Sequence, residues 1–428
     1  MRRHRIQGLL LAEHEFAVPL DHARPGEETI SVFVREARAA GKEDADLPYL
    51  LFLQGGPGSP AARPTGLETW IARATQDYHL LLIDQRGTGR STPVLAQTLV
   101  RLGSPQAQAD YLKLFRADSI VRDAEVVRAH LGGGEPWALI GQSYGGFCST
   151  TYLSIAPEGV REAYVTGGLP PLDRPADDVY RATYRRVADR NRRYYERYPQ
   201  DVDTVRRLVE LLGSEDVRFA DGSRLTPRRL LQAGSIFGMS YGFEKVHYLV
   251  EIAFAGEREV SSQFLRALDE QLPFDPAPIY SLLHEACYAQ GEATRWSAQR
   301  ILAEFPEFSL DTDGPVFFTG EMVYPWQFDE YRELQPLKEA AELLAEYEDW
   351  PRLYDAEQLR ANDIPVAAAV YENDMYVERE FSLETAAVMG ARAWVTSRYE
   401  HDGLRSWGTE VVSNLIALQR GQVHSLDL

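Results

Sequence analysis

Residues 141–146 (GQSYGG) limit the possible folds of this chain more than any other segment. They follow the apolar run 137–140, which is typical of a buried strand, and they precede a stretch that is compatible with a helix. Small residues on both sides of Ser143 allow the backbone to turn tightly from strand to helix. Such a turn exposes the serine beside the helix N-terminus, where backbone N–H groups favour negative charge. The alternative is a plain glycine-rich turn, because glycine and serine are common residues.

The rest of the sequence divides into three sections. Short apolar runs alternate with longer amphipathic stretches over 1–168 and again over 352–428, which indicates a mostly parallel sheet flanked by helices. Residues 169–351 are instead rich in Arg, Glu, Tyr and Leu at helical spacing. We therefore expect an α/β core domain (1–168 and 352–428) with an inserted helical cap domain (169–351). The predicted strands are 30–35, 49–53, 80–83, 137–140, 161–166, 365–371 and 393–395, and the main predicted helices are 119–131, 178–198, 201–212, 337–347, 381–389 and 406–418.

A serine hydroxyl becomes a nucleophile when a general base lies within hydrogen-bond reach and an acid orients that base. The histidines that follow Ser143 are His247, His284, His401 and His424. The first two fall in the predicted insertion, and the last lies close to the C-terminus. His401 falls in a loop between the strand at 393–395 and the closing helix, so it is the candidate base.

The acid that orients the base is expected at the end of the preceding strand. Asp374 follows the strand 365–371, on the edge where ligands bind in open α/β sheets. Asp402 is too close in sequence to His401 to reach its far ring nitrogen. Asp374 is therefore the preferred acid, and Glu372 is its rival.

Residues 54–58 (QGGPG) form a glycine-rich loop after the strand at 49–53. Gly55 and Gly56 let a substrate carbonyl approach the backbone without a Cβ clash. Together with the N–H of Tyr144, the N–H groups of this loop are the expected oxyanion hole. The alternatives are a plain turn or a phosphate-binding loop, but the segment matches neither GxGxxG nor GxxxxGK[ST].

A third motif, residues 84–91 (DQRGTGRS), follows the strand predicted at 80–83. Charged side chains that flank two glycines at a strand end indicate a tight turn braced by Asp–Arg pairing. We expect this turn to support the glycine-rich loop rather than to take part in the chemistry.

Together these segments resemble those of the proline iminopeptidase (prolyl aminopeptidase) family of α/β-hydrolases. That family carries a glycine-proline oxyanion loop, an Asp-Gln-Arg-Gly turn and a Gly-x-Ser-Tyr-Gly-Gly elbow, which stand here at 55–58, 84–87 and 141–146. The resemblance covers most of the chain and is specific in the α/β core. It implies an α/β-hydrolase fold, a catalytic set of Ser143, Asp374 and His401, and release of an N-terminal residue, typically proline, from peptides. Gln54 departs from the pattern, because the family's loop often has histidine there, and this leaves the preferred substrate open.

An aminopeptidase has to bind a charged α-amine, and carboxylates in a partly desolvated pocket would do so. The resemblance implies that they come from the cap. The candidates, each of which could also be a surface or helix-capping residue, are Glu244 and Glu285, ahead of Glu321. Aromatic residues that could line a slot for a pyrrolidine ring are Phe237, Tyr241, Phe243 and Trp326.

Composition argues against several other classes of protein. With 45 Lys and Arg against 64 Asp and Glu, the net charge of -19 is opposite to that of nucleic-acid binders. The apolar run 9–12 is too short for a signal peptide, and no run approaches a membrane span. Two cysteines, Cys148 and Cys287, make no disulfide framework and no zinc spacing. We therefore expect a cytoplasmic enzyme without metal or organic cofactor.

The expected partner is a peptide with a free N-terminus, with no nucleic acid and no membrane, and nothing in the sequence indicates an oligomeric state. Two other functions use the same residues. An esterase or a different exopeptidase would use the same serine chemistry, since fold does not determine substrate. A binding protein of this fold would lack turnover, and the complete set of Ser143, Asp374 and His401 argues against it.

Overall fold

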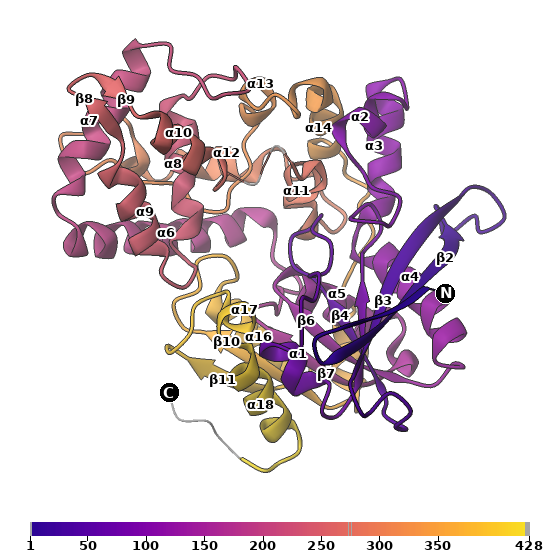
Figure 1. The fold of residues 1–428 in the computed structure, drawn as a ribbon. Helices are drawn as coiled ribbons and strands as arrows, with labels where there is room; N and C mark the ends of the chain where they lie inside the picture. Colours follow the sequence, from indigo (N-terminus) through magenta and orange to yellow (C-terminus); the bar gives the residue numbers. More distant parts are fainter. Residues whose placement is uncertain (1, 273, 275, 424–428) are drawn as a thin grey trace.

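A nine-stranded sheet is the base on which the rest of the molecule is built (Figure 1). The computed structural model describes residues 2–272, 274 and 276–423. The sheet order is β1-β2-β3-β5-β4-β6-β7-β10-β11, and the strands from β5 onward in that order pair in parallel. The strands are β1 (Arg2–Ile6), β2 (Leu9–Pro19), β3 (Thr29–Ala39), β4 (Tyr49–Leu53), β5 (His79–Ile83), β6 (Trp137–Gln142), β7 (Val160–Thr166), β10 (Val366–Tyr371) and β11 (Arg392–Thr396).

The central strands are apolar throughout because helices cover both faces of the sheet. In β4, Leu51 and Leu53 point into one hydrophobic core, which also contains residues of α4 and α5. Leu50 and Phe52 point into a second core with residues of α1 and α18. The two cores confirm the predicted α/β class. The helices outside the insertion are α1 (Thr69–Ala74), α2 (Ala96–Val100), α3 (Pro105–Leu112), α4 (Ala117–Leu131), α5 (Tyr144–Ile155), α15 (Ala356–Ala361), α16 (Arg379–Val388), α17 (Gly403–Ser406) and α18 (Gly408–Gln419).

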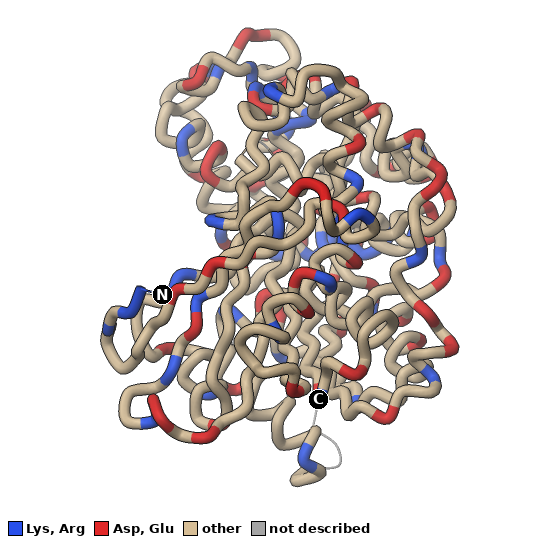
Figure 2. Tube along the Cα trace, turned by 90° about the vertical axis from the view of Figure 1, so that its right-hand side faces the viewer, with Lys and Arg blue, Asp and Glu red and all other residues tan. Residues whose placement is uncertain are grey.

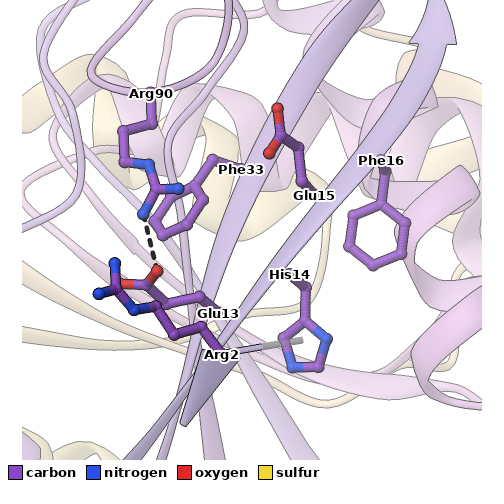
Figure 3. A pocket seen from close by; sticks show the side chains of 7 residues that line it. All are labelled: Arg2, Glu13, His14, Glu15, Phe16, Phe33 and Arg90. Carbon is purple, nitrogen blue, oxygen red and sulfur yellow. Dashed lines mark hydrogen bonds and ion pairs between the residues drawn. The ribbon is translucent and has the colours of Figure 1, made fainter. Parts of the chain in front are cut away.

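The N-terminal strands β1 and β2 form an antiparallel hairpin that the sequence analysis did not predict. The apolar run 9–12 belongs to β2, whose residues Leu9 and Leu11 are buried. A hollow of about 410 Å³ lies beside this hairpin and is lined by Arg2, Glu13, His14, Glu15, Phe16, Phe33 and Arg90 (Figure 3). None of the predicted site residues lines it.

Between β7 and β10 the chain forms mostly helices, which lie to one side of the sheet in Figure 1. We call residues 169–351 the cap. Its centre is aromatic, with Tyr194, Phe237 and Phe318 packed against one another. The elements are α6 (Ala176–Arg197), α7 (Asp201–Ser214), α8 (Pro227–Leu231), α9 (Gly242–Glu251), α10 (Ser262–Asp269), α11 (Pro278–Leu283), α12 (Ser297–Leu302), α13 (Gln327–Glu330), α14 (Lys338–Ala345) and the short hairpin β8 (Phe254–Gly256) and β9 (Glu259–Val260).

Acidic and basic residues are both scattered over the trace (Figure 2). Many of them form ion pairs, so the net charge of -19 does not gather in one segment. In the described ranges no helix is long and apolar enough to cross a membrane. Among the same residues no group of three or more His, Cys, Asp and Glu side chains could hold a metal ion.

Candidate active site

Ser143 occupies a strained turn between β6 and α5. Its φ of 55° and ψ of -125° lie in a region that non-glycine residues rarely adopt. The surrounding glycines make this turn possible, because a Cβ at residue 145 would lie 1.9 Å from the carbonyl oxygen of Leu53. A Cβ at residue 168 would lie 2.3 Å from the carbonyl oxygen of Ser143. The turn therefore has the geometry of a nucleophile elbow.

The three predicted catalytic residues form one chain of hydrogen bonds. Nε2 of His401 lies 2.9 Å from Oγ of Ser143, and Nδ1 lies 2.7 Å from Oδ2 of Asp374. An ionised carboxylate can only accept, so Nδ1–H donates to Asp374 and Nε2 accepts the serine proton. The other oxygen of Asp374 accepts from the backbone N–H groups of Tyr376 and Val377, at 2.8 and 3.1 Å. These bonds fix the carboxylate, and with it the orientation of the imidazole.

The rival residues lie elsewhere. Glu372 forms an ion pair with Arg379, and Asp402 accepts from the N–H and hydroxyl of Ser240. His247 binds Asp201. His424 lies outside the described residues. The structure thus brings together Ser143, Asp374 and His401.

The charge of Asp374 determines how His401 titrates. Burial disfavours the imidazolium, but the adjacent Asp374 outweighs burial and raises the pKa of His401 above its ordinary value of 6.5, and Glu321 adds to this effect. A general base has to be neutral, so with His401 as the base we expect activity to fall as the pH falls through the raised pKa.

We therefore expect the reaction of the protein with an uncharged ester to fall on the acid side with a midpoint above pH 6.5. An ester without an amine keeps substrate titration out of the profile. The measurement is kcat/KM against pH, and Glu321→Gln should move the midpoint downward because it removes a negative charge. A midpoint below 6.5 in the unaltered protein would contradict the assignment of His401 as the base.

The glycine-rich loop lies directly over the serine. A Cβ at residue 55 would lie 3.1 Å from Cβ of Ser143. The N–H of Gly55 donates to the side-chain oxygen of Gln54 at 3.2 Å, so a substrate oxyanion at this N–H would replace the Gln54 oxygen. Tyr144 begins α5, and its N–H therefore has no acceptor within the helix. Both predicted sources of oxyanion donors thus border Ser143.

The turn at 84–91 supports this loop, but its ion pairs differ from the predicted ones. Gln85 donates to the carbonyl oxygen of Gln54 at 3.1 Å. Asp84 is paired with Arg63, and the buried Arg86 is paired with Asp123. The predicted Asp–Arg pair within the turn is therefore wrong, because Asp84 and Arg86 pair with distant segments, although Asp84 also accepts the backbone N–H of Arg90 at 2.9 Å.

Among the three cap acids, the structure brings Glu321 near His401. Its charge raises the pKa of His401, and about a quarter of its side chain is exposed. Tyr280 donates to Glu321 at 2.6 Å, and Nε2 of His284 lies 3.6 Å from its other oxygen. Burial disfavours the carboxylate, but His284 and Tyr280 outweigh burial and lower the pKa of Glu321. This carboxylate is therefore ionised at neutral pH.

The sequence-based preference for Glu244 and Glu285 over Glu321 is not supported by the structure. Glu244 forms an ion pair with Arg197. Both oxygens of the buried Glu285 accept backbone N–H groups at the start of α12, from Ser297 at 3.1 Å and Ala298 at 2.8 Å. These partners already occupy both carboxylates.

The proposed aromatic slot also differs from the observed arrangement. Phe237 and Phe243 pack into the aromatic centre of the cap, and Tyr241 is 66% exposed at the start of α9. Trp326 stacks on Tyr324. The sequence analysis missed two aromatic residues at the site: Tyr280, which donates to Glu321, and Tyr376, whose ring lies 4.5 Å from that of His401. The one local signal for Tyr376 is its position two residues after Asp374.

Comparisons with known proteins identify relatives of this chain. The α/β hydrolase fold family matches residues 48–248. A proline iminopeptidase from Aeromonas sobria is 49% identical over 417 residues, which cover 97% of this chain and 98% of that protein. A proline iminopeptidase from Aspergillus aculeatus is 36% identical over 96% of this chain and 94% of its own length. The crystal structure of a Mycobacterium smegmatis proline iminopeptidase covers 95% of this chain and 98% of its own, with a TM-score of 0.43 and 14% identity. Two of these relatives are 49% and 36% identical to this chain over nearly its full length, and the chain therefore belongs to the proline iminopeptidase family of α/β-hydrolases.

Proposed function

We propose that this protein is a serine aminopeptidase that releases N-terminal proline, or a similar residue, from peptides. The observation that carries the proposal is the hydrogen-bonded chain from Ser143 through His401 to Asp374, with the ionised Glu321 beside it. The chain of hydrogen bonds supplies an activated nucleophile. The extra carboxylate supplies a partner for a substrate cation.

The proposed reaction is acyl transfer. His401 takes the proton of the Ser143 hydroxyl as Oγ attacks the carbonyl carbon of the first residue. The N–H groups of Tyr144 and of the loop at Gly55 and Gly56 bind the resulting oxyanion. His401 then gives its proton to the leaving amine, and water hydrolyses the acyl-enzyme by the same steps. None of these reaction steps requires a metal ion or an organic cofactor.

Glu321 is the proposed partner of the substrate α-amine. A charge-assisted bond in a partly desolvated pocket is stronger than a neutral one. Tyr280 and His284 leave Glu321 ionised, as the binding of an ammonium group requires.

An esterase on the same residues is the second candidate. An ester without an amine has no group for Glu321 to neutralise, and the ionised carboxylate therefore favours the aminopeptidase. A binding protein without turnover is disfavoured, because the hydrogen bonds among Ser143, His401 and Asp374 are complete.

The proposal is tested with proline-β-naphthylamide, alanine-β-naphthylamide, N-acetylproline-β-naphthylamide and p-nitrophenyl acetate as parallel substrates. We expect fast cleavage of the free-amine proline substrate and a loss of about 4 kcal/mol of transition-state binding on acetylation, or roughly 1,000-fold in kcat/KM. Cleavage of the ester without cleavage of any amide would contradict the peptidase proposal and favour the esterase.

We further propose that residues 1–168 and 352–428 form one core domain and residues 169–351 a cap domain. All nine strands of the large sheet lie outside the cap, which supports this division. A cytoplasmic location is proposed as well, since Cys148 and Cys287 are buried free thiols.

A further inference from the structure

The loop that carries the catalytic histidine is bonded to the cap at three consecutive residues. Glu400 is paired with Arg190 of α6. The N–H of His401 donates to the carbonyl oxygen of Gly238 at 3.2 Å. Asp402 accepts from the N–H and hydroxyl of Ser240, both at 2.8 Å. Figure 1 shows α6 passing above this C-terminal part of the chain. The cap is thus in direct contact with the backbone that positions His401.

Arg190 also binds the loop of the catalytic acid. Nη2 donates to the carbonyl oxygen of Asn373 at 2.8 Å and to Glu400, and Nη1 donates to Glu400 at 3.0 Å. Asn373 immediately precedes Asp374, and Glu400 immediately precedes His401. One planar guanidinium therefore joins the two loops at equivalent positions, a geometry that the compact ammonium of lysine does not offer.

Burial makes this contact demanding. Arg190 is 3% exposed, and a buried charge is stable only when it is paired and hydrogen-bonded. Loops otherwise vary in position more than the elements they connect. Tyr376 adds a further contact between the cap and the loop of the catalytic acid. Its hydroxyl donates to the carbonyl oxygen of Ser235 in the cap, and its ring centroid lies 4.5 Å from that of His401.

We propose that Arg190 is a positioning residue, which by binding Glu400 and Asn373 together sets the separation of the two loops and aligns His401 with Asp374 and Ser143. The inference rests on the proposed catalytic roles of those three residues. It assigns to the cap a part in building the nucleophile, besides its proposed part in binding the α-amine. The hydrogen bonds of Arg190 go to Glu400 and Asn373, not to Ser143 or to Glu321, the proposed partner of the α-amine. A substitution of Arg190 should therefore affect turnover rather than substrate binding.

The test compares Arg190→Met with Arg186→Met in the full chain. Arg186 lies one turn earlier in α6 and binds Glu378 of the core through two hydrogen bonds, of 2.8 and 2.6 Å. Both variants remove one positive charge and one contact between cap and core. Only Arg190 joins the loops of His401 and Asp374. Arg186→Met is therefore the control for the loss of charge and for general stability.

For Arg190→Met we expect kcat to fall about 100-fold, because small misplacements of a reacting group have effects of this size. KM for proline-β-naphthylamide should change little. Hydrolysis of p-nitrophenyl acetate and the labelling of Ser143 by a fluorophosphonate should slow in parallel, because neither depends on the amine. Arg186→Met should keep the rates of the unaltered protein, and Arg190→Lys should lie between, since lysine keeps the charge but not the planar fork.

Equal rates in Arg190→Met and Arg186→Met would overturn the positioning role while leaving the proposed function intact. Failure of the unaltered protein to react with the fluorophosphonate would overturn the proposed function itself, and the inference with it. If Arg190→Met does not fold, Glu400→Gln provides the second test, because it keeps the side-chain shape and weakens the same contact. A loss of about tenfold in the labelling rate is expected there, and no loss would overturn the inference.

Discussion

Replacement of Ser143 by alanine should reduce kcat/KM for proline-β-naphthylamide by about 10⁴-fold to 10⁶-fold, the range found when the nucleophile of a serine hydrolase is removed. The remaining rate would come from substrate binding and the oxyanion donors alone. The loss should extend to p-nitrophenyl acetate, because both substrates require attack by the same Oγ.

The substitution should leave the fold unchanged. Ser143 makes one side-chain hydrogen bond, to His401 at 2.9 Å, and alanine adds no atom that could clash with Gly55 above it. The measurements are steady-state rates and the denaturant midpoint of the variant beside the unaltered protein. Mass spectrometry should locate a fluorophosphonate adduct on Ser143 and find none in the variant. Retention of activity or of the adduct by Ser143→Ala would place the nucleophile elsewhere.

The core of the site is predictable from the sequence because each part follows a strand. Ser143, Asp374 and the glycine-rich loop come after β6, β10 and β4, and parallel strands bring their C-terminal ends to one edge. His401 follows β11 in the same way. The order of these residues along the chain therefore translates directly into their proximity in the fold.

The partners of the charged residues are not predictable in this way, because they depend on contacts between distant segments. Asp84 pairs with Arg63 rather than with its neighbour Arg86, since the loop after Pro57 folds back on the turn. Glu285 accepts a hydrogen bond from the backbone N–H of Ser297, which lies 12 residues later in the sequence. No periodic pattern indicates such a pairing.

The hairpin of β1 and β2 was missed for a different reason. β1 has the sequence RRHRI and is exposed over most of its length, so it has no apolar alternation. It lies at the edge of the sheet, where charged side chains hinder pairing with other chains. An edge strand of this kind resembles a polar terminus in sequence.

Replacement of Glu321 by glutamine should reduce kcat/KM for proline-β-naphthylamide roughly 1,000-fold, because it removes one partner of a desolvated ion pair. This factor corresponds to a loss of about 4 kcal/mol of transition-state binding. Glutamine keeps the shape of the side chain and still accepts from Tyr280, so the pocket should remain intact. Hydrolysis of p-nitrophenyl acetate should change far less, because that ester has no amine. The expected result is thus a selective loss for substrates with a free N-terminus.

Glu285→Gln and Glu244→Gln are the matched controls, since they remove the same charge from the other two cap acids. Glu285→Gln should lower the denaturant midpoint, because its carboxylate binds the first N–H groups of α12. Glu244→Gln should change little, because its ion pair with Arg197 is partly exposed to solvent. Neither should change the ratio of amide to ester hydrolysis.

The ratio of rates for the free and N-acetylated proline substrates distinguishes the possible roles of Glu321. If its carboxylate binds the α-amine, Glu321→Gln should slow the free-amine substrate and leave the acetylated substrate, which has no ammonium group, almost unchanged. The ratio of the two rates should then fall close to one. If Glu321 acted only by raising the pKa of His401, Glu321→Gln would move the acid midpoint of both substrates and of the ester to lower pH by the same amount, and any change in rate would depend on pH. An unchanged ratio in Glu321→Gln, with a shifted pH profile, would therefore reassign this carboxylate from substrate binding to the tuning of His401.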